Sequence, residues 1–202
     1  MNTSRSFDTR KLVLLALLTA IVVVLQVLAI LARPLFPAFT ITLVLMPIIV
    51  GAALVGVYAG CWLGLVFGFA VLISGDAAPF MAVNVLGTIL VVLLKGALAG
   101  LAAGAVYALI AKKSKTAAAF VAAAVCPIVN TGIFVAGSYI FFLPTIKEWW
   151  GGADYSNVTA FIFLGMIGVN FLVELVLNLV LCPVIIRLVQ YGQDRREIRR
   201  VV

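Results

Sequence analysis

The fold is decided by an uncharged run near the start of the chain, residues 12–32, which reads LVLLALLTAIVVVLQVLAILA. It lies between the basic pair Arg10-Lys11 and the pair Arg33-Pro34, which ends it. About 20 predominantly apolar residues cross the hydrocarbon core of a bilayer as a helix. A signal peptide has a shorter apolar region of about 7–15 residues, and its small-residue cleavage pattern does not follow here. We therefore expect a retained transmembrane helix.

The composition of the whole chain agrees with this run. Of the 202 residues, 65% are hydrophobic and 10% are charged, whereas soluble domains have about 45–50% apolar and about 25% charged residues. These values exclude a water-soluble fold, a disordered chain and a disulfide-rich secreted domain. The chain has no histidine, which excludes histidine acid–base chemistry, Ser-His-Asp triads and histidine metal sites. We expect no cofactor and no metal.

The apolar runs predict an all-α integral membrane protein, a six-transmembrane-helix bundle that forms one domain over residues 1–202. Spans two and three share one apolar run, which we split near Gly51–Val55 because it is too long for a single crossing at about 1.5 Å per residue. A turn at Gly75–Pro79 precedes span four, and a polar loop from Leu143 to Asn157 precedes span six. The expected spans are residues 12–32, 39–53, 56–74, 81–111, 116–142 and 158–189.

Basic residues gather on one side of this topology. Eleven of the fourteen lie in the N-terminal segment, in the loop between spans four and five, or in the C-terminal tail together with Arg187. Cytoplasmic loops carry the excess of lysine and arginine, so we expect both termini in the cytosol. The net charge of +7 then serves topology and lipid headgroups. It does not indicate a nucleic-acid partner, because no soluble basic face is predicted.

Two ionisable residues lie deep inside predicted spans, Lys95 in the fourth and Glu174 in the sixth. Each costs about 2.5–3.5 kcal/mol or more there unless it is paired or faces a cavity. Amides and hydroxyls share their helix faces or lie on the fifth span. The candidate substrate-binding set is Asn84, Thr88, Lys95, Asn130, Thr131, Tyr139, Asn170, Glu174 and Asn178. These groups are either an ion pair with interhelical packing contacts or the lining of a cavity for a polar organic solute. We favour the cavity, because so many buried polar groups need partners.

Small residues form a second pattern. Glycines recur every four residues on the third and fourth spans, at Gly56, Gly60, Gly64, Gly68, Gly96, Gly100 and Gly104. Such ridges let two backbones approach closely, and we expect internal helix packing. Ala16 and Ala20 on the first span have the same spacing, which indicates either internal packing or a docking face. Trp149 and Trp150 in the outer loop are interpreted as an interfacial anchor or as a lid.

Five sequence segments, taken in their order and spacing, resemble a known family. The segments are Lys11 to Ala20, Pro47-Ile48-Ile49-Val50-Gly51, Lys95-Gly96-Ala97-Leu98-Ala99-Gly100, Pro127-Ile128-Val129-Asn130-Thr131-Gly132, and Asn170-xxx-Glu174. Over nearly the whole chain they resemble the substrate-binding S components of energy-coupling factor (ECF) vitamin transporters, in the riboflavin, pantothenate and folate group.

This resemblance implies a multi-pass subunit of a bacterial or archaeal plasma membrane that holds one vitamin molecule in a cavity open to the outside. Spans four to six and the outer loops would form the pocket from the candidate residues. The first three spans, with Ala16 and Ala20, would dock onto a transmembrane coupling subunit driven by two cytosolic ATPase subunits. The chain itself lacks G-x-x-x-x-G-K-[ST], the phosphate-binding loop motif of many ATPases. The resemblance implies a substrate-binding subunit and not an enzyme, with ATP hydrolysed by the partner subunits.

The substrate is argued from the same side chains. A deep lysine suits a carboxylate, and amides suit hydroxyl and amide groups, which together favour pantothenate. The motif at residues 127–132 also looks most like pantothenate-type members. If Glu174 already neutralises Lys95, a neutral ligand such as riboflavin is favoured instead. Few tryptophans and tyrosines lie inside the spans to stack a flat ring, which disfavours riboflavin and folate.

Three rival classes fit less well. An autonomous secondary transporter usually shows inverted repeats, and the two halves of this chain have no convincing repeat. A membrane-embedded enzyme without histidine would need a Ser-Lys dyad or paired carboxylates. Asp76 and Glu174 are predicted at different depths, and no serine is placed at the level of Lys95. A structural scaffold would have no use for a costly polar cluster.

Overall fold

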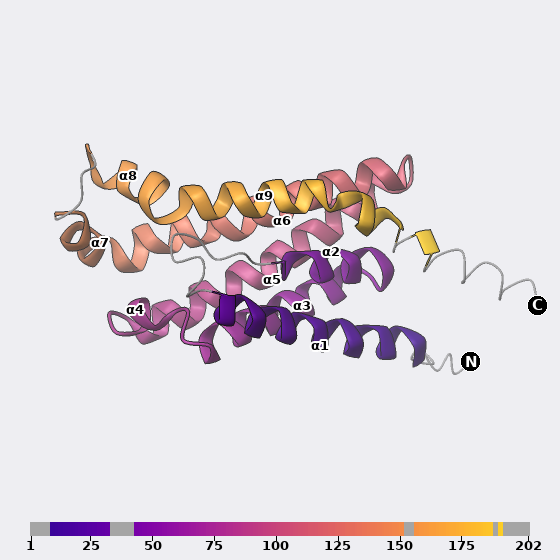
Figure 1. Cartoon of the computed structure of the whole chain (residues 1–202), viewed down its shortest axis with the longest axis horizontal. Helices are drawn as coiled ribbons and strands as arrows, with labels where there is room; N and C mark the ends of the chain where they lie inside the picture. Colours follow the sequence, from indigo (N-terminus) through magenta and orange to yellow (C-terminus); the bar gives the residue numbers. More distant parts are fainter. Residues whose placement is uncertain (1–8, 33–42, 152–155, 188–189, 192–202) are drawn as a thin grey trace, which may run out of the picture.

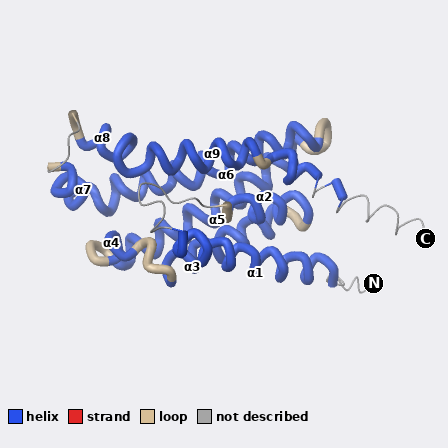
Figure 2. Tube along the Cα trace, viewed as in Figure 1, coloured by secondary structure: helices blue, strands red, loops and turns tan. Residues whose placement is uncertain are grey.

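The structure is a computed structural model that describes residues 9–32, 43–151, 156–187 and 190–191. Every regular element within these ranges is a helix (Figure 2), as expected. η1 and η2 are π-helices, and residues 182–187 form one further short helix. The labelled elements are α1 (Thr9–Ala32), α2 (Leu45–Leu54), α3 (Val57–Ile73), α4 (Ala78–Met81), α5 (Val85–Ile110), α6 (Lys115–Gly137), η1 (Ser138–Phe142), α7 (Leu143–Trp150), α8 (Val158–Ala160), η2 (Phe161–Gly168) and α9 (Val169–Val180).

Four helical stretches are long and apolar enough to cross a membrane. They are Thr9–Ala32, Val85–Ile110, Lys115–Trp150 and Val158–Val180. α2 and α3 are apolar but shorter. At about 1.5 Å per residue, α2 reaches about half of a 30 Å hydrocarbon core. The break between α2 and α3 falls at Val55 and Gly56, where the sequence predicts it. Residues 39–42 of the expected second span lie outside the described residues.

The long helices pack side by side (Figure 1). α3 packs against α5, α5 against α6, and α6 against α9, while α1 covers α3. α2 contacts α1, α3, α5 and α6, and eight of its ten residues are buried. A short apolar helix enclosed by four others is the centre of the apolar core. It stays uncharged because an ionisable side chain would find no water there.

Glycines form the contact between α3 and α5. A Cβ atom on Gly64 would overlap the carbonyl oxygen of Gly96, and a Cβ on Gly60 would overlap that of Gly100. Because neither helix has a side chain at these points, the two backbones touch directly. The expectation of internal packing is confirmed for both ridges. Gly56 is the exception, since it is the N-cap of α3 with φ 137°, a conformation that favours glycine.

The fourth predicted span begins later than expected. The sequence predicts one helix from Met81, but the chain forms the short α4 and then starts α5 at Val85. Asn84 is the N-cap of α5, and its side-chain oxygen accepts a hydrogen bond from the Gly87 backbone N–H at 2.9 Å. An N-cap side chain satisfies one of the free donors of the first turn. Asn84 therefore ends the turn before the helix instead of lying on its inner face.

The predicted polar loop from Leu143 is partly a helix. Residues Leu143–Trp150 form α7, with proline in the first turn. Proline at this position lacks only a donor that the first turn leaves unpaired, and its fixed φ suits a helix start. The prediction of a loop was therefore wrong for this segment, and Trp149 lies on a helix.

The two ends of the bundle differ. The start of α1, the α2–α3 connection, the α5–α6 turn and residues 182–187 lie at one end, and α4, α7 and α8 lie at the other (Figure 1). The α5–α6 turn, which contains Lys112 and Lys113, therefore lies at the same end as the start of α1 and residues 182–187.

Candidate functional site

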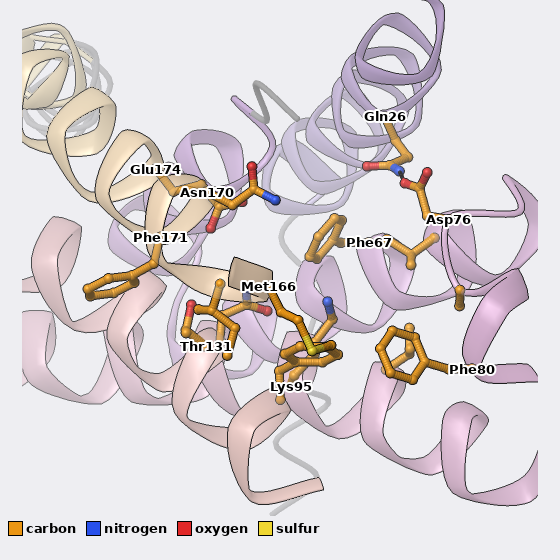
Figure 3. A pocket seen from close by; sticks show the side chains of 16 residues that line it. Gln26, Phe67, Asp76, Phe80, Lys95, Thr131, Met166, Asn170, Phe171 and Glu174 are labelled. Atoms are coloured by element: carbon orange, nitrogen blue, oxygen red, sulfur yellow. Dashed lines mark hydrogen bonds between the residues drawn. The ribbon is translucent and has the colours of Figure 1, made fainter. Parts of the chain in front are cut away.

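A cavity of about 240 Å³ lies among α1, α3, α5, α6, η2 and α9. Its lining residues come from the parts of these helices nearest α4 and α7, so it lies toward that end of the bundle. Figure 3 shows side chains entering it from two sides, Asn170 and Glu174 from α9, and Gln26 and Asp76 from α1 and the 74–77 turn. The helices therefore enclose a polar space within an apolar protein.

Five of the nine predicted binding residues line this cavity. They come from three helices that are far apart in the sequence, and they are Lys95, Asn130, Thr131, Asn170 and Glu174. Asn130 is 6% exposed, and its Oδ1 has no hydrogen-bond partner among the described residues. A buried amide oxygen without a donor costs about 1–3 kcal/mol, so a donor from a ligand or from water would stabilise it.

The ammonium group of Lys95 lies against aromatic rings. Its Nζ is 5.4 Å from the ring centroid of Phe134 and 5.9 Å from that of Phe67. Both distances suit a cation–π contact. Glu174 lines the same cavity as this ammonium, and whether the two pair stays a prediction. A lysine ammonium has three N–H donors, so besides lying against these rings it can donate to oxygen acceptors in the cavity.

The other four candidates do not line the cavity, and each has a local partner. Thr88, 1% exposed, donates to the Asn84 backbone carbonyl at 2.7 Å, and Asn84 is the cap described above. Tyr139 donates to the Thr159 hydroxyl at 3.1 Å. Asn178, 2% exposed, donates through Nδ2 to the Glu174 backbone carbonyl at 2.7 Å.

Gln26 and Asp76 line the cavity although the sequence analysis did not select them. Gln26 is the only amide in the uncharged run of the first span, and that isolation was the available signal. Asp76 was expected at a different depth from Glu174, and both residues line the cavity. The pocket also extends to α1 and α3, beyond the spans that the resemblance implies.

Aromatic side chains form much of the cavity wall. Phe67, Phe80, Phe134 and Phe171 line it together with Met166. The ring of Phe80 lies 5.5 Å from Phe134 and 5.6 Å from Trp149 on α7, both edge to face. Trp149 therefore packs against a wall residue of the cavity. Phenylalanines therefore supply the stacking groups that tryptophans and tyrosines do not.

Ala16 and Ala20 are exposed on α1, while Leu18 and Val22 of the same helix are buried. The pair therefore faces outward and does not take part in packing within the described chain.

Among the described residues, no group of three or more histidine, cysteine, aspartate or glutamate side chains could hold a metal ion. The cavity can bind an organic solute through one ammonium, two carboxylates, three amides and a hydroxyl.

Comparisons with known proteins give one match. Searches of curated proteins and of solved structures find none. Residues 10–186 match the protein family described as ECF transporter, substrate-specific component. The matched region includes every residue that lines the cavity and, except for Thr9, all four long apolar stretches. The chain therefore belongs to the family of substrate-specific components of ECF transporters, the membrane subunits that bind the transported substrate.

Proposed function

We propose that the chain is the high-affinity capture subunit of an ATP-driven importer for a water-soluble vitamin, and that the vitamin is pantothenate. The observation that carries this proposal is the cavity with the Lys95 ammonium, which lies against the rings of Phe67 and Phe134. Such an ammonium suits the carboxylate of a ligand, with a charge-assisted hydrogen bond about twice as strong as a neutral one. Asn130 and Asn170 suit hydroxyl and amide groups.

The size of the cavity supports a small vitamin. Its volume of about 240 Å³ lies below the range of about 300–1,000 Å³ that is typical of sites for drug-sized ligands. Riboflavin and folate are larger than pantothenate and carry flat rings. The four phenylalanines of the wall favour a ring-bearing ligand, so riboflavin is the second candidate.

The proposal includes a membrane topology. We propose six crossings with both termini in the cytosol of a bacterium or archaeon. Support comes from the basic residues of α1, the α5–α6 turn and residues 182–187, which lie at one end of the bundle and would be the cytoplasmic side by the positive-inside rule. The cavity lies toward the other end, where it would receive a solute from outside.

The substrate assignment is tested by calorimetric titration of the purified chain with pantothenate, riboflavin and folate. We expect tight binding of pantothenate and weak or absent binding of the other two. Tight riboflavin binding with none for pantothenate would reverse the order of the candidates.

We further propose that Ala16 and Ala20 contact the transmembrane coupling subunit, which works with two ATPase subunits. The outward position of both residues supports a contact with a partner chain, because small residues let helices approach closely in a membrane. Ala20→Leu should leave vitamin binding unchanged and abolish uptake in vesicles that contain the complete transporter.

The matched control is Val24→Leu, at an exposed position one turn further along α1, which should transport normally. Normal uptake by Ala20→Leu would remove the docking assignment. Uptake by the chain alone, without coupling and ATPase subunits, would instead favour an autonomous secondary transporter.

A further inference from the structure

Gln26 is an unusual residue for its helix. α1 is apolar, and its neighbouring residues Val24, Val27 and Leu28 are about half exposed, as suits a helix that contacts lipid. Gln26 is 1% exposed and lines the cavity. A buried primary amide is costly in an apolar setting unless both of its ends are hydrogen-bonded. Each end of this amide therefore needs a hydrogen-bond partner.

The nitrogen end of the Gln26 amide is occupied. Its Nε2 donates to Oδ2 of Asp76 and lies 3.5 Å from the hydroxyl of Ser74. A carboxylate only accepts hydrogen bonds, so Asp76 fixes which end of the amide faces it. The tie joins α1 to the turn between α3 and α4, two segments that are 50 residues apart.

The oxygen end of the amide points away from Asp76 (Figure 3). Gln26 Oε1 is buried and accepts no hydrogen bond from any described residue. Rotating the amide would not repair this, because it would turn an acceptor toward Asp76 and lose the existing bond. The orphaned oxygen is therefore a fixed acceptor in the cavity wall. Asn130 Oδ1 is a second buried orphaned acceptor in the same cavity, contributed by α6.

We propose that Gln26 is a ligand-binding residue contributed by α1, and that its Oε1 accepts a hydrogen bond from a hydroxyl group of the substrate. This inference rests on the proposed function and adds a requirement to the substrate. The ligand must carry at least one hydrogen-bond donor placed toward α1, in addition to the group that meets Lys95. Asp76 and Ser74 are then positioning residues, which act by turning the amide.

The inference also extends the binding site to the first helix. A site confined to α5, α6 and α9 would be complete without α1. A site that includes Gln26 is complete only while α1 and the 74–77 turn lie together as the Gln26–Asp76 bond holds them. Bound ligand would therefore stabilise the contact between α1 and that turn.

The test is a comparison of two proteins and three ligands by calorimetry. The proteins are the wild-type chain and Gln26→Leu, which keeps a similar volume and removes the amide. The ligands are pantothenate and two analogues, each with one of its two hydroxyl groups replaced by hydrogen. We expect Gln26→Leu to weaken pantothenate binding about three- to tenfold, because one buried hydrogen bond is lost.

The decisive readout is whether the loss of affinity caused by Gln26→Leu and the loss caused by removing one substrate hydroxyl add up or overlap. For one of the two analogues, Gln26→Leu should cause little further loss, because the donor that Gln26 meets is already gone. If Gln26 only supports the fold, the substitution will weaken all three ligands by the same factor, and the inference is wrong. Unchanged pantothenate binding by Gln26→Leu would also overturn it while leaving the proposed function intact.

Two further outcomes are distinguishable. If the wild-type chain binds riboflavin or folate and not pantothenate, the substrate assignment fails, and Gln26→Leu is then measured with the vitamin that binds, where an unchanged affinity overturns the inference. If the wild-type chain binds none of the three, the proposed function fails and the inference fails with it.

Asp76→Asn serves as the matched variant for the positioning role, and it should weaken binding less than Gln26→Leu because an amide can still accept from Gln26 Nε2.

Discussion

In the contact between α3 and α5, glycine backbones touch with no side chain between them. In the cavity, by contrast, polar side chains line a space of about 240 Å³. The two regions meet on α5, where Gly96 belongs to the first and its neighbour Lys95 to the second. One is close-packed and has no polar side chain to satisfy. The other contains buried acceptors that no described residue satisfies. Close packing on one face of α5 gives a rigid support for a binding space on another.

The glycine contact is the place where a single substitution should do most damage. Gly64→Leu would force a side chain into the Gly96 carbonyl, and since both helices are fixed by their other neighbours, overpacking should cost about 3 kcal/mol or more. We expect a large loss of monodisperse protein in detergent and a lower melting temperature.

The matched control is Gly132→Leu on α6, where a Cβ atom would meet nothing within 4 Å. It should be tolerated, because glycine is disfavoured in a helix by about 1 kcal/mol relative to alanine and leucine is among the good helix formers. Equal damage from the two variants would show that glycine is not needed for close approach at Gly64.

The cavity should respond in the opposite way, with function lost and fold kept. Lys95→Met retains an apolar stem against Phe67 and Phe134 and removes the ammonium. Vitamin binding should fall well over tenfold because a charge-assisted contact is lost, and the melting temperature without ligand should change little. Calorimetry and a thermal melt measure the two effects.

A different result would favour the ion-pair explanation. If Lys95→Met unfolds the protein and Glu174→Gln rescues it, the two residues support the fold together, and Lys95 is not a substrate contact.

A smaller effect separates two asparagines that look alike in the sequence. Asn130 lines the cavity and has an orphaned oxygen, while Asn178 donates to the backbone of its own helix. Asn130→Ala should weaken vitamin binding about three- to tenfold, in line with one hydrogen bond of about 0.5–1.5 kcal/mol. Asn178→Ala should leave binding unchanged. Equal losses of affinity would mean that the cavity does not define the site.

The sequence predicts much of the fold because the fold depends on apolar length. The uncharged run of α1 and the long apolar stretches of α5 and α6 could be found with a bilayer thickness and a rise per residue. The start of α5 could not, since the apolar pattern continues through α4, and the break depends on Asn84 capping the helix. Proline in the first turn of α7 was a helix signal, but the polar composition of the segment concealed it.

The candidate site was predicted in part, and the geometry of a helix explains the division. Asn170, Glu174 and Asn178 follow steps of four residues, and each step turns the side chain by about 40° around the helix. Asn170 and Glu174 both line the cavity, whereas Asn178, two steps and about 12 Å further along the helix than Asn170, does not. Thr88 shares a face with Lys95 but lies about 10 Å along the axis. Gln26 could not be placed at all, because only the fold brings α1 to the cavity.

The central claim is that the cavity around Lys95 holds the transported vitamin, and a structure of the chain determined with pantothenate at saturating concentration tests it most directly. We predict ligand density among α5, α6 and α9, with a carboxylate oxygen of the ligand within hydrogen-bond distance of Lys95 Nζ and a hydroxyl or amide donor near Asn130 Oδ1. Density for the vitamin at another place on the protein, with the cavity around Lys95 filled only by water, would contradict the account.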